Sequence, residues 1–214
     1  MIYNEKITRI DRNSPLNYIK NLRDKTPNFT LIDVGICANA WTKEYVTHGV
    51  DIQKYNIDIH QFTGNISDVL VWDEILKYVD VYGKFDFLTC THTLEDISAA
   101  VMVCNMFSRI AKEGFIAVPS KFWELNRHEG HWRGFIHHRW VYEAKDGKFK
   151  GYPKQSFLEN SDYIESWTKS NPARPENLEL QFFWKNEVKL DVVNQDLLGP
   201  SIEHVIQYYR ELVK

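Results

Sequence analysis

Apolar runs along the chain alternate with segments of helical periodicity. The first run, residues 29–35 (FTLIDVG), closes on an aspartate and a glycine, as is typical of a buried parallel strand that leads into a turn. Ser14 and Pro15 stand where an N-cap and a first helical residue are expected, and Leu16, Ile19 and Leu22 then share one helical face. The pattern predicts further strands at residues 45–51, 58–62, 85–90 and 114–120, and further helices at 72–79 and 98–112.

Strands that alternate with helices favour right-handed crossovers and a Rossmann-like α/β fold with a mostly parallel central sheet and helices on both faces. We expect residues 29–34, 85–90 and 115–118 to be neighbouring parallel strands that are buried on both faces. A ligand crevice in such a sheet lies at the carboxyl ends of the strands. The residues predicted near that rim are Asp33, Asp51, Asn65, Thr91 and Ser120.

The pattern changes after Ser120. A loop rich in Trp, His and Arg is followed by a predicted hairpin at 138–152 that turns at Asp146 and Gly147, a second hairpin at 178–193 and a closing helix at 202–213. We therefore expect a single domain over residues 1–214, in which residues 121–200 form a hairpin-rich cap or substrate-side insertion.

Composition excludes several classes of protein. A net charge of −3 and a pI near 6.2 disfavour general nucleic-acid binding, and the sequence holds no apolar stretch long enough for a membrane span. Three widely spaced cysteines indicate reduced thiols, and the first residues resemble no targeting segment, so a cytoplasmic location is expected. The expected partner is a small-molecule substrate, while the oligomeric state stays open.

Two residues have the positions that a nucleoside cofactor requires. A carboxylate after the second strand, Asp51, can accept hydrogen bonds from a ribose diol, and Gly35 lets the backbone after the first strand approach the cofactor. Asp33 can orient that glycine turn. Asn65 could lie near an adenine or serve as a turn residue.

The region from about Phe29 to Ser120 resembles the class I S-adenosylmethionine-dependent methyltransferases of the methyltransferase-11-like kind. The segment 90–96 (CTHTLED) is similar to the loop that follows their fourth strand, and residues 35–41 (GICANAW) resemble a short variant of the glycine loop in which Asn39 replaces a later glycine. A later pattern of Pro119, Ser120, Glu124 and residues 138–140 (HRW) occurs in similar proteins. The resemblance implies S-adenosylmethionine as cofactor, with the binding residues Asp33, Gly35, Asn39, Asp51, Asn65 and Thr91.

The glycine motif is degenerate, and residues 36–50 leave little room for the helix that normally follows it. We expect that helix to be lost or reduced to a turn. A scaffold protein that keeps the fold without binding cofactor is therefore an alternative.

Candidate catalytic residues lie in two places. His92 is expected to face the transferred methyl group, and Glu95 beside it could act there or simply favour a helix N-terminus. In residues 121–140, Glu124, His138 and Arg139 are expected to face His92 across the acceptor pocket. The histidines could act as general bases, and Arg127, Arg133 and Arg139 could hold an anion.

Two other uses of residues 121–140 stay open. His128 and His131 with His137 or His138 could ligate zinc in a metal-dependent hydrolase, although Gly130 and Gly134 argue against a rigid helical site, and no metal is predicted. The segment could also be a structural wall of stacked rings. The favoured hypothesis is a methyltransferase that acts on a small anionic or sugar-like acceptor.

Overall fold

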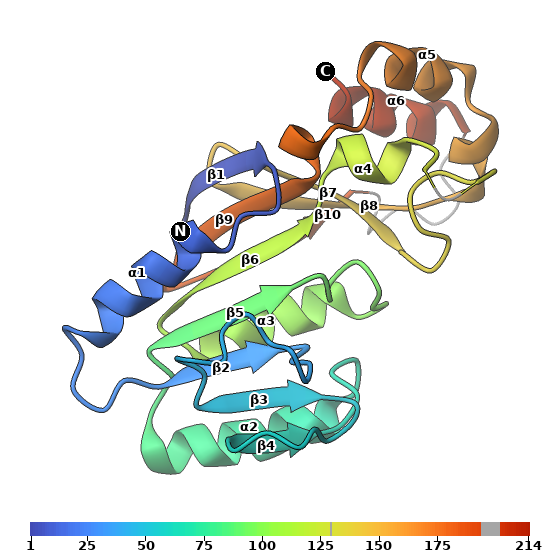
Figure 1. The fold of residues 1–214 in the computed structure, drawn as a ribbon. Coiled ribbons are helices and arrows are strands. Elements are labelled where there is room, and N and C mark those ends of the chain that lie inside the picture. The colour runs from blue at the N-terminus through green and yellow to red at the C-terminus, as the bar shows by residue number, and fades with distance from the viewer. Residues whose placement is uncertain (129, 194–201) are drawn as a thin grey trace.

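The computed structural model describes residues 1–128, 130–193 and 202–214. A seven-stranded sheet has the order β1-β9-β6-β5-β2-β3-β4, and a three-stranded sheet lies beside it (Figure 1). The strands of the larger sheet are β1 (Ile2–Thr8), β2 (Leu31–Val34), β3 (His48–Asp51), β4 (His60–Thr63), β5 (Phe87–Thr91), β6 (Glu113–Pro119) and β9 (Glu179–Lys185).

The centre of the sheet is parallel. Strands β6, β5, β2, β3 and β4 pair in parallel, and β2, β5 and β6 are neighbours that are buried almost throughout. Continuous apolar runs such as FDFLTC predict this double burial, because helices cover both faces of the sheet. The predicted arrangement of residues 29–34, 85–90 and 115–118 is confirmed.

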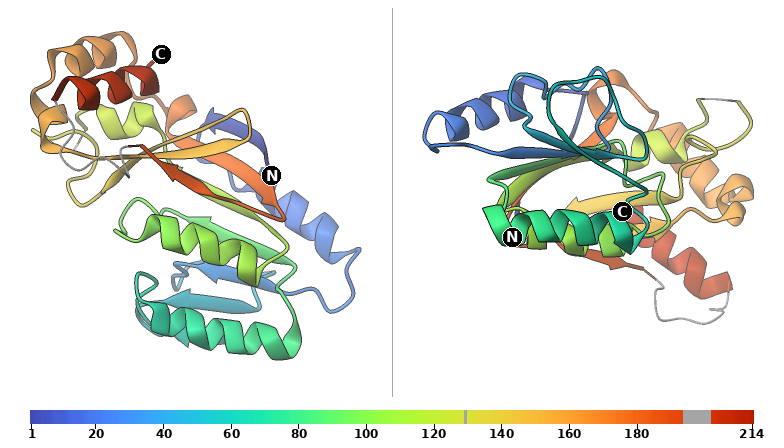
Figure 2. Two further views of the ribbon diagram at one scale, coloured as in Figure 1. Left: turned by 180° about the vertical axis from the view of Figure 1, so that it is seen from behind. Right: turned by 90° about the horizontal axis from the view of Figure 1, so that it is seen from below.

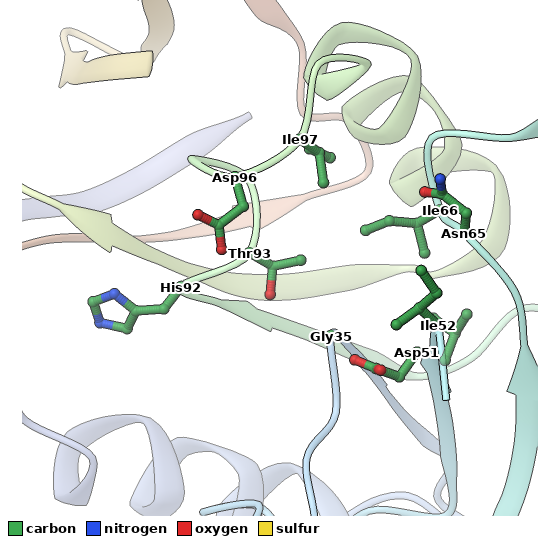
Figure 3. A pocket seen from close by; sticks show the side chains of 10 residues that line it. Gly35, Asp51, Ile52, Asn65, Ile66, His92, Thr93, Asp96 and Ile97 are labelled. Atoms are coloured by element: carbon green, nitrogen blue, oxygen red, sulfur yellow. The ribbon is translucent and has the colours of Figure 1, made fainter. Parts of the chain in front are cut away.

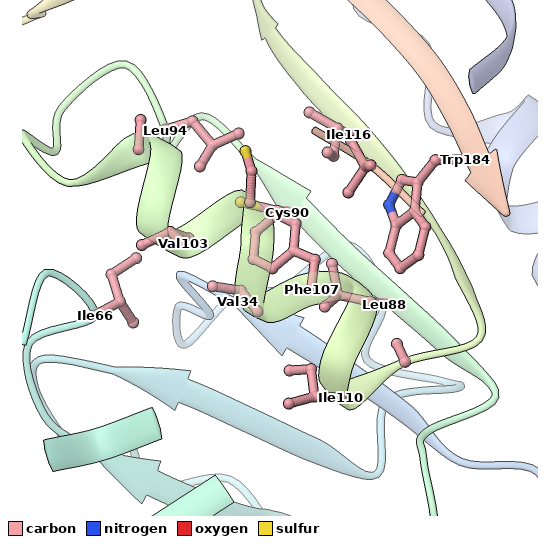
Figure 4. Close-up of a cluster of buried hydrophobic side chains, with 14 of the residues drawn as sticks. Val34, Ile66, Leu88, Cys90, Leu94, Val103, Phe107, Ile110, Ile116 and Trp184 are labelled. Carbon is pink, nitrogen blue, oxygen red and sulfur yellow. The ribbon is translucent and has the colours of Figure 1, made fainter. Parts of the chain in front are cut away.

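Helices pack on both faces of the sheet. The helices α2 (Val69–Tyr82) and α3 (Ala100–Ile110) cover one face, and α1 (Asn13–Arg23) covers the other (Figure 2). The larger core lies under α2 and α3, where Val103 and Phe107 of α3 meet Leu88 of β5 and Trp184 of β9 (Figure 4). On the opposite face, Ile19 of α1 belongs to a second cluster that also contains buried side chains of β2, β5, β6 and β9.

The start of α1 differs from the prediction. Ser14 is inside the helix, and its hydroxyl donates to a carboxylate oxygen of Asp11, which also accepts from the backbone N–H of Asn13. The Asp11 carboxylate therefore accepts from a backbone N–H of the first helical turn, as a serine N-cap would, and it accepts from the Ser14 hydroxyl as well.

The smaller sheet contains β7 (Trp140–Lys145), β8 (Lys148–Pro153) and β10 (Leu190–Val192), in the order β10-β8-β7. The turn between β7 and β8 has φ values of 53° at Asp146 and 71° at Gly147, so the predicted hairpin and its turn are confirmed. The remaining helices are α4 (Lys121–Leu125), η1 (Ser156–Asn160), α5 (Asp162–Ser170), η2 (Pro175–Asn177) and α6 (Ile202–Leu212).

The second predicted hairpin is wrong. Strand β9 pairs antiparallel with β6 and β1 in the central sheet, whereas β10 pairs in parallel with β8 in the smaller sheet. Asn186, with φ at 64°, turns the chain between the two sheets. Residues 121–200, expected as a cap, therefore contribute one strand to the central sheet, and their last part lies outside the described residues.

No helix in the described ranges is both long enough and apolar enough to cross a bilayer.

Candidate functional site

A pocket of about 270 Å³ opens at the carboxyl ends of β2, β3 and β5. The chain runs from β2 outward to β3 and β4 on one side and to β5 and β6 on the other, so the pocket lies at the topological switch point of the sheet. Its lining is shown in Figure 3 and consists of Gly35, Val50, Asp51, Ile52, Asn65, Ile66, His92, Thr93, Asp96 and Ile97.

Gly35 forms the floor of this pocket. Its φ is 83°, and a Cβ atom there would lie 2.1 Å from Oγ1 of Thr93. Its backbone N–H donates to the carbonyl of Val50. Only glycine satisfies both the left-handed backbone and this close approach, which brings the end of β2 against the loop after β5.

No helix follows β2 before β3. Residues 36–47 form successive turns, which confirms the predicted loss of that helix. Asp33 is buried, and its Oδ2 accepts from the Thr42 hydroxyl at 2.7 Å; burial raises the pKa of Asp33 to about 6. The Thr91 hydroxyl accepts from the indole N–H of Trp41. Asp33 and Thr91 thus hold the loop and do not line the pocket, and Asn39 is exposed outside it.

Polar and apolar side chains alternate along the opposite wall. Asp51 ends β3, and its Oδ1 accepts from the backbone of Gln53. Ile52 beside it is 71% exposed, which is high for an isoleucine. Ile66 and Ile97 complete an apolar surface, while the side chain of Asn65 accepts from the backbone of Ser67. Of the six predicted cofactor residues, the pocket therefore brings together Gly35, Asp51 and Asn65.

His92 separates this pocket from a second cavity of about 190 Å³. That cavity is almost entirely apolar and is lined by Ile10, His92, Pro119, Trp123, Phe135 and Leu178. Nε2 of His92 lies 2.6 Å from Glu179, and its Nδ1 lies 3.2 Å from Glu95. Glu179 also accepts two hydrogen bonds from Arg12, each of 2.7 Å.

This ion-pair network fixes the charge of His92. Burial alone would lower the pKa of His92, but its hydrogen bonds to Glu179 and Glu95 raise it to about 9. Burial would raise the pKa of Glu179, yet Arg12 and His92 hold it at about 2. His92 is thus an imidazolium at neutral pH with both ring nitrogens engaged, which does not favour the predicted use as a general base. Glu95 is its buried partner and lies outside α3, so the helix-cap alternative for Glu95 is wrong.

A second buried pair lies in the 121–140 segment. Glu124 is fully buried, and its Oε1 accepts from Nδ1 of His138 at 2.6 Å. Lys154 donates to the other carboxylate oxygen. Because a carboxylate accepts at Nδ1, neutral His138 has its lone pair on Nε2, which lies 3.6 Å from Oδ1 of Asp96. Glu124 therefore orients the ring of His138 so that Nε2 faces Asp96.

The arginines of this segment have protein partners. Arg127 binds Glu159, and Arg133 is buried against Glu165 and two backbone carbonyls. Nε of Arg139 donates to the carbonyl of Asp96. They do not converge on a cavity as the expected three-arginine clamp requires.

The histidines divide into two groups. The ring of His128 packs edge-on against Trp123, and His131 is exposed. His137 and His138 instead gather with Asp96. The alternative zinc site, in which His128 and His131 join His137 or His138, is not formed among the described residues.

Arg12 and Glu179 could not be predicted as site residues, because they meet His92 only through the fold. The one local signal is a glutamate at the start of the apolar run ELQFFW, where a charged residue needs a partner once the strand is buried. No sequence pattern marked Ile52, Thr93 or Ile97 as pocket residues. Asp96 lies in the segment 90–96 (CTHTLED), but that pattern does not mark it as a pocket residue.

No family model matches the chain, and no curated protein matches it significantly. Among solved structures, the chain is similar to the N-terminal domain of EvdMO1 with SAH bound, at 8% identity over 81% of this chain and 82% of that one, with a TM-score of 0.42. It is also similar to a putative S-adenosylmethionine-dependent methyltransferase from Listeria monocytogenes (13% identity; 80% and 99% covered; TM-score 0.37). A third match is the plantazolicin methyltransferase BpumL in complex with SAH (11%; 79% and 80%; 0.38). Similarity at this level does not assign an activity.

Proposed function

We propose that the chain is an S-adenosylmethionine-dependent methyltransferase that binds its cofactor in the 270 Å³ pocket. The observation that supports this most directly is Asp51 at the end of β3, beside the apolar side chains of Ile52 and Ile66. A carboxylate next to an apolar surface suits a nucleoside, because the ribose diol donates two hydrogen bonds while the adenine needs an apolar wall.

The turns after β2 favour this cofactor over dinucleotides. Dinucleotides and nucleoside triphosphates bind their phosphates at the N-terminus of a helix that follows the first strand. In this chain residues 36–47 provide no helix. S-adenosylmethionine carries no phosphate, so it does not require one.

The acceptor belongs in the apolar cavity on the other side of His92. Trp123 and Phe135 offer ring faces there, and the three nearby arginines are engaged elsewhere, so a sugar-like acceptor suits the cavity better than an anionic one. Methyl transfer from a sulfonium is a displacement in which positioning supplies much of the rate enhancement. The Arg12–Glu179–His92–Glu95 network positions the wall between donor and acceptor. His138, oriented by Glu124 and packed against Phe135 of this cavity, is the proposed base for the acceptor proton when no metal ion is bound.

Ligand selectivity tests the proposal. Calorimetric titration of the full chain with S-adenosylhomocysteine, S-adenosylmethionine, NAD⁺ and ATP should show binding of the first two only. Tighter binding of NAD⁺ or ATP would contradict the assignment of the pocket. Absence of binding by all four at millimolar concentration would favour the non-catalytic scaffold.

A further inference from the structure

Three potential metal ligands from two separate segments meet at the outer edge of the site. Oδ1 of Asp96 lies 3.6 Å from Nε2 of His138 and 3.7 Å from Nε2 of His137. The three ligand atoms all lie within 4.8 Å of one another. We propose that Asp96, His137 and His138 bind one divalent transition-metal ion.

The spacing of these atoms is close to that of a coordination sphere. Separations of 3.6 and 3.7 Å are too long for hydrogen bonds. Four ligands at about 2.0–2.1 Å from a tetrahedral zinc ion lie roughly 3.3 Å from one another. The side chains of Asp96 and His137 are 44% and 62% exposed, so small rotations of these two groups are enough to close the sphere.

His138 is built as a ligand. Its side chain is only 7% exposed, and Glu124 accepts from Nδ1, which leaves the lone pair of the neutral ring on Nε2. No hydrogen bond in the described part of the chain occupies Nε2. Metal-binding histidines characteristically donate their second nitrogen to a carboxylate, which fixes the tautomer and the ring orientation. Lys154 forms an ion pair with Glu124, so the charge of this buried carboxylate is balanced even when no metal ion is bound.

The cluster adjoins both cavities. Asp96 lines the 270 Å³ pocket, and Phe135, which lines the apolar cavity, packs against the rings of His137 and His138. Three protein ligands leave coordination positions open for a substrate. Imidazole and carboxylate ligands together suit Zn²⁺, Fe²⁺ or Mn²⁺.

The class of acceptor follows if the proposed methyltransferase function holds. An ion at this place selects a molecule with two adjacent oxygen donors, such as the vicinal diol of a sugar, and lowers the pKa of the bound hydroxyl. With Nε2 of His138 on the ion, His138 no longer serves as the base, and the hydroxyl proton leaves to solvent. An oxygen lone pair forms the new O–CH₃ bond as the S–CH₃ bond of the sulfonium breaks, and the sulfur keeps the electron pair as a thioether. Metal binding itself does not depend on this use.

Zinc titration of the full chain tests the site. We expect one Zn²⁺ per chain by calorimetry and by elemental analysis after dialysis. The variants His137→Ala and Asp96→Asn should each weaken zinc binding at least tenfold, and Glu124→Gln should weaken it by about 10- to 100-fold. His137 is the most exposed of the three ligands, so its removal leaves the fold intact, which circular dichroism verifies. His131→Ala and Cys37→Ser should bind zinc as the wild type does, because both residues are exposed outside the cluster.

Absence of zinc binding, or binding that His137→Ala and Asp96→Asn leave unchanged, would overturn the metal site. Titration of the same samples with S-adenosylhomocysteine separates this result from the cofactor proposal. Zinc binding without S-adenosylhomocysteine binding would support the metal site while removing the methyltransferase function. Binding of S-adenosylhomocysteine without binding of zinc would overturn the metal site alone.

Discussion

His92 and Glu179 join the loop after β5 to the start of β9, with 2.6 Å between Nε2 and a carboxylate oxygen. Arg12, which precedes α1, holds the same carboxylate through two further hydrogen bonds. The network therefore ties three distant parts of the chain together at the wall between the two cavities. A change at either residue affects stability and the site together.

The first prediction concerns pH. Hydrogen bonds to Glu179 and Glu95 outweigh burial and raise the pKa of His92 to about 9, above the ordinary value near 6.5. A raised histidine pKa gives stability that is complete below about pH 6.5 and is lost as pH rises through about 9. The melting temperature of His92→Gln should therefore be lower than that of the wild type, and the difference should be largest at pH 6 and should shrink toward pH 10. His131→Gln serves as the control. A gap that stays constant with pH would contradict the charged state of His92.

The second prediction concerns Asp33. Burial raises the pKa of Asp33 to about 6, although the hydrogen bond from Thr42 acts to lower it. A raised carboxyl pKa means that ionisation opposes folding, so the wild type should lose stability as pH rises from about 4 through 6. Asp33→Asn should remove this loss and be at least as stable as the wild type at pH 8. Thr42→Val, which removes the hydroxyl that donates to the buried carboxylate, should cost about 1–3 kcal/mol by chemical denaturation. Strong destabilisation by Asp33→Asn at pH 8 would refute the argument.

The third prediction compares two glycines of the 121–140 segment. Both have positive φ, but a Cβ at Gly134 would lie 2.5 Å from the Glu124 carboxylate, whereas one at Gly130 would meet nothing within 4 Å. Both alanine variants carry backbone strain of about 1–3 kcal/mol. Only Gly134→Ala should also displace Glu124, and so lower the melting temperature further and weaken zinc binding. Equal losses in the two variants would show that Gly134 serves the backbone alone.

The sequence predicted the central sheet well because its strands carry continuous apolar runs, which only a doubly covered sheet accommodates. It did not reveal β1, since IYNEKIT has few apolar residues and its pairing with β9 depends on a partner far along the chain. The run FFW predicted a strand but not the sheet that it joins. Pairing partners are set by tertiary packing, which local patterns do not encode.

Some residues of the candidate site could likewise be predicted from the sequence, and others could not. Gly35 and Asp51 could be predicted because strand ends in this fold meet at one rim. Glu179 could not, because its partner His92 is 87 positions away in the sequence. The prediction for His92 failed to anticipate its charge for the same reason: Glu95 is only three positions away, but Glu179, whose hydrogen bond raises the pKa of His92 the most, reaches it through the fold.

The most direct test of the cofactor pocket compares two aspartates. Asp51 lines the pocket, and Asp58 is an exposed carboxylate of the same region that does not. Calorimetric titration with S-adenosylhomocysteine should give one site per chain for the wild type and for Asp58→Ala. Asp51→Ala should bind more weakly by about 1.5–3 kcal/mol, the value of hydrogen bonds to a charged group. Equal binding by the Asp51 and Asp58 variants, or no binding by the wild type at millimolar ligand, would contradict the proposed function.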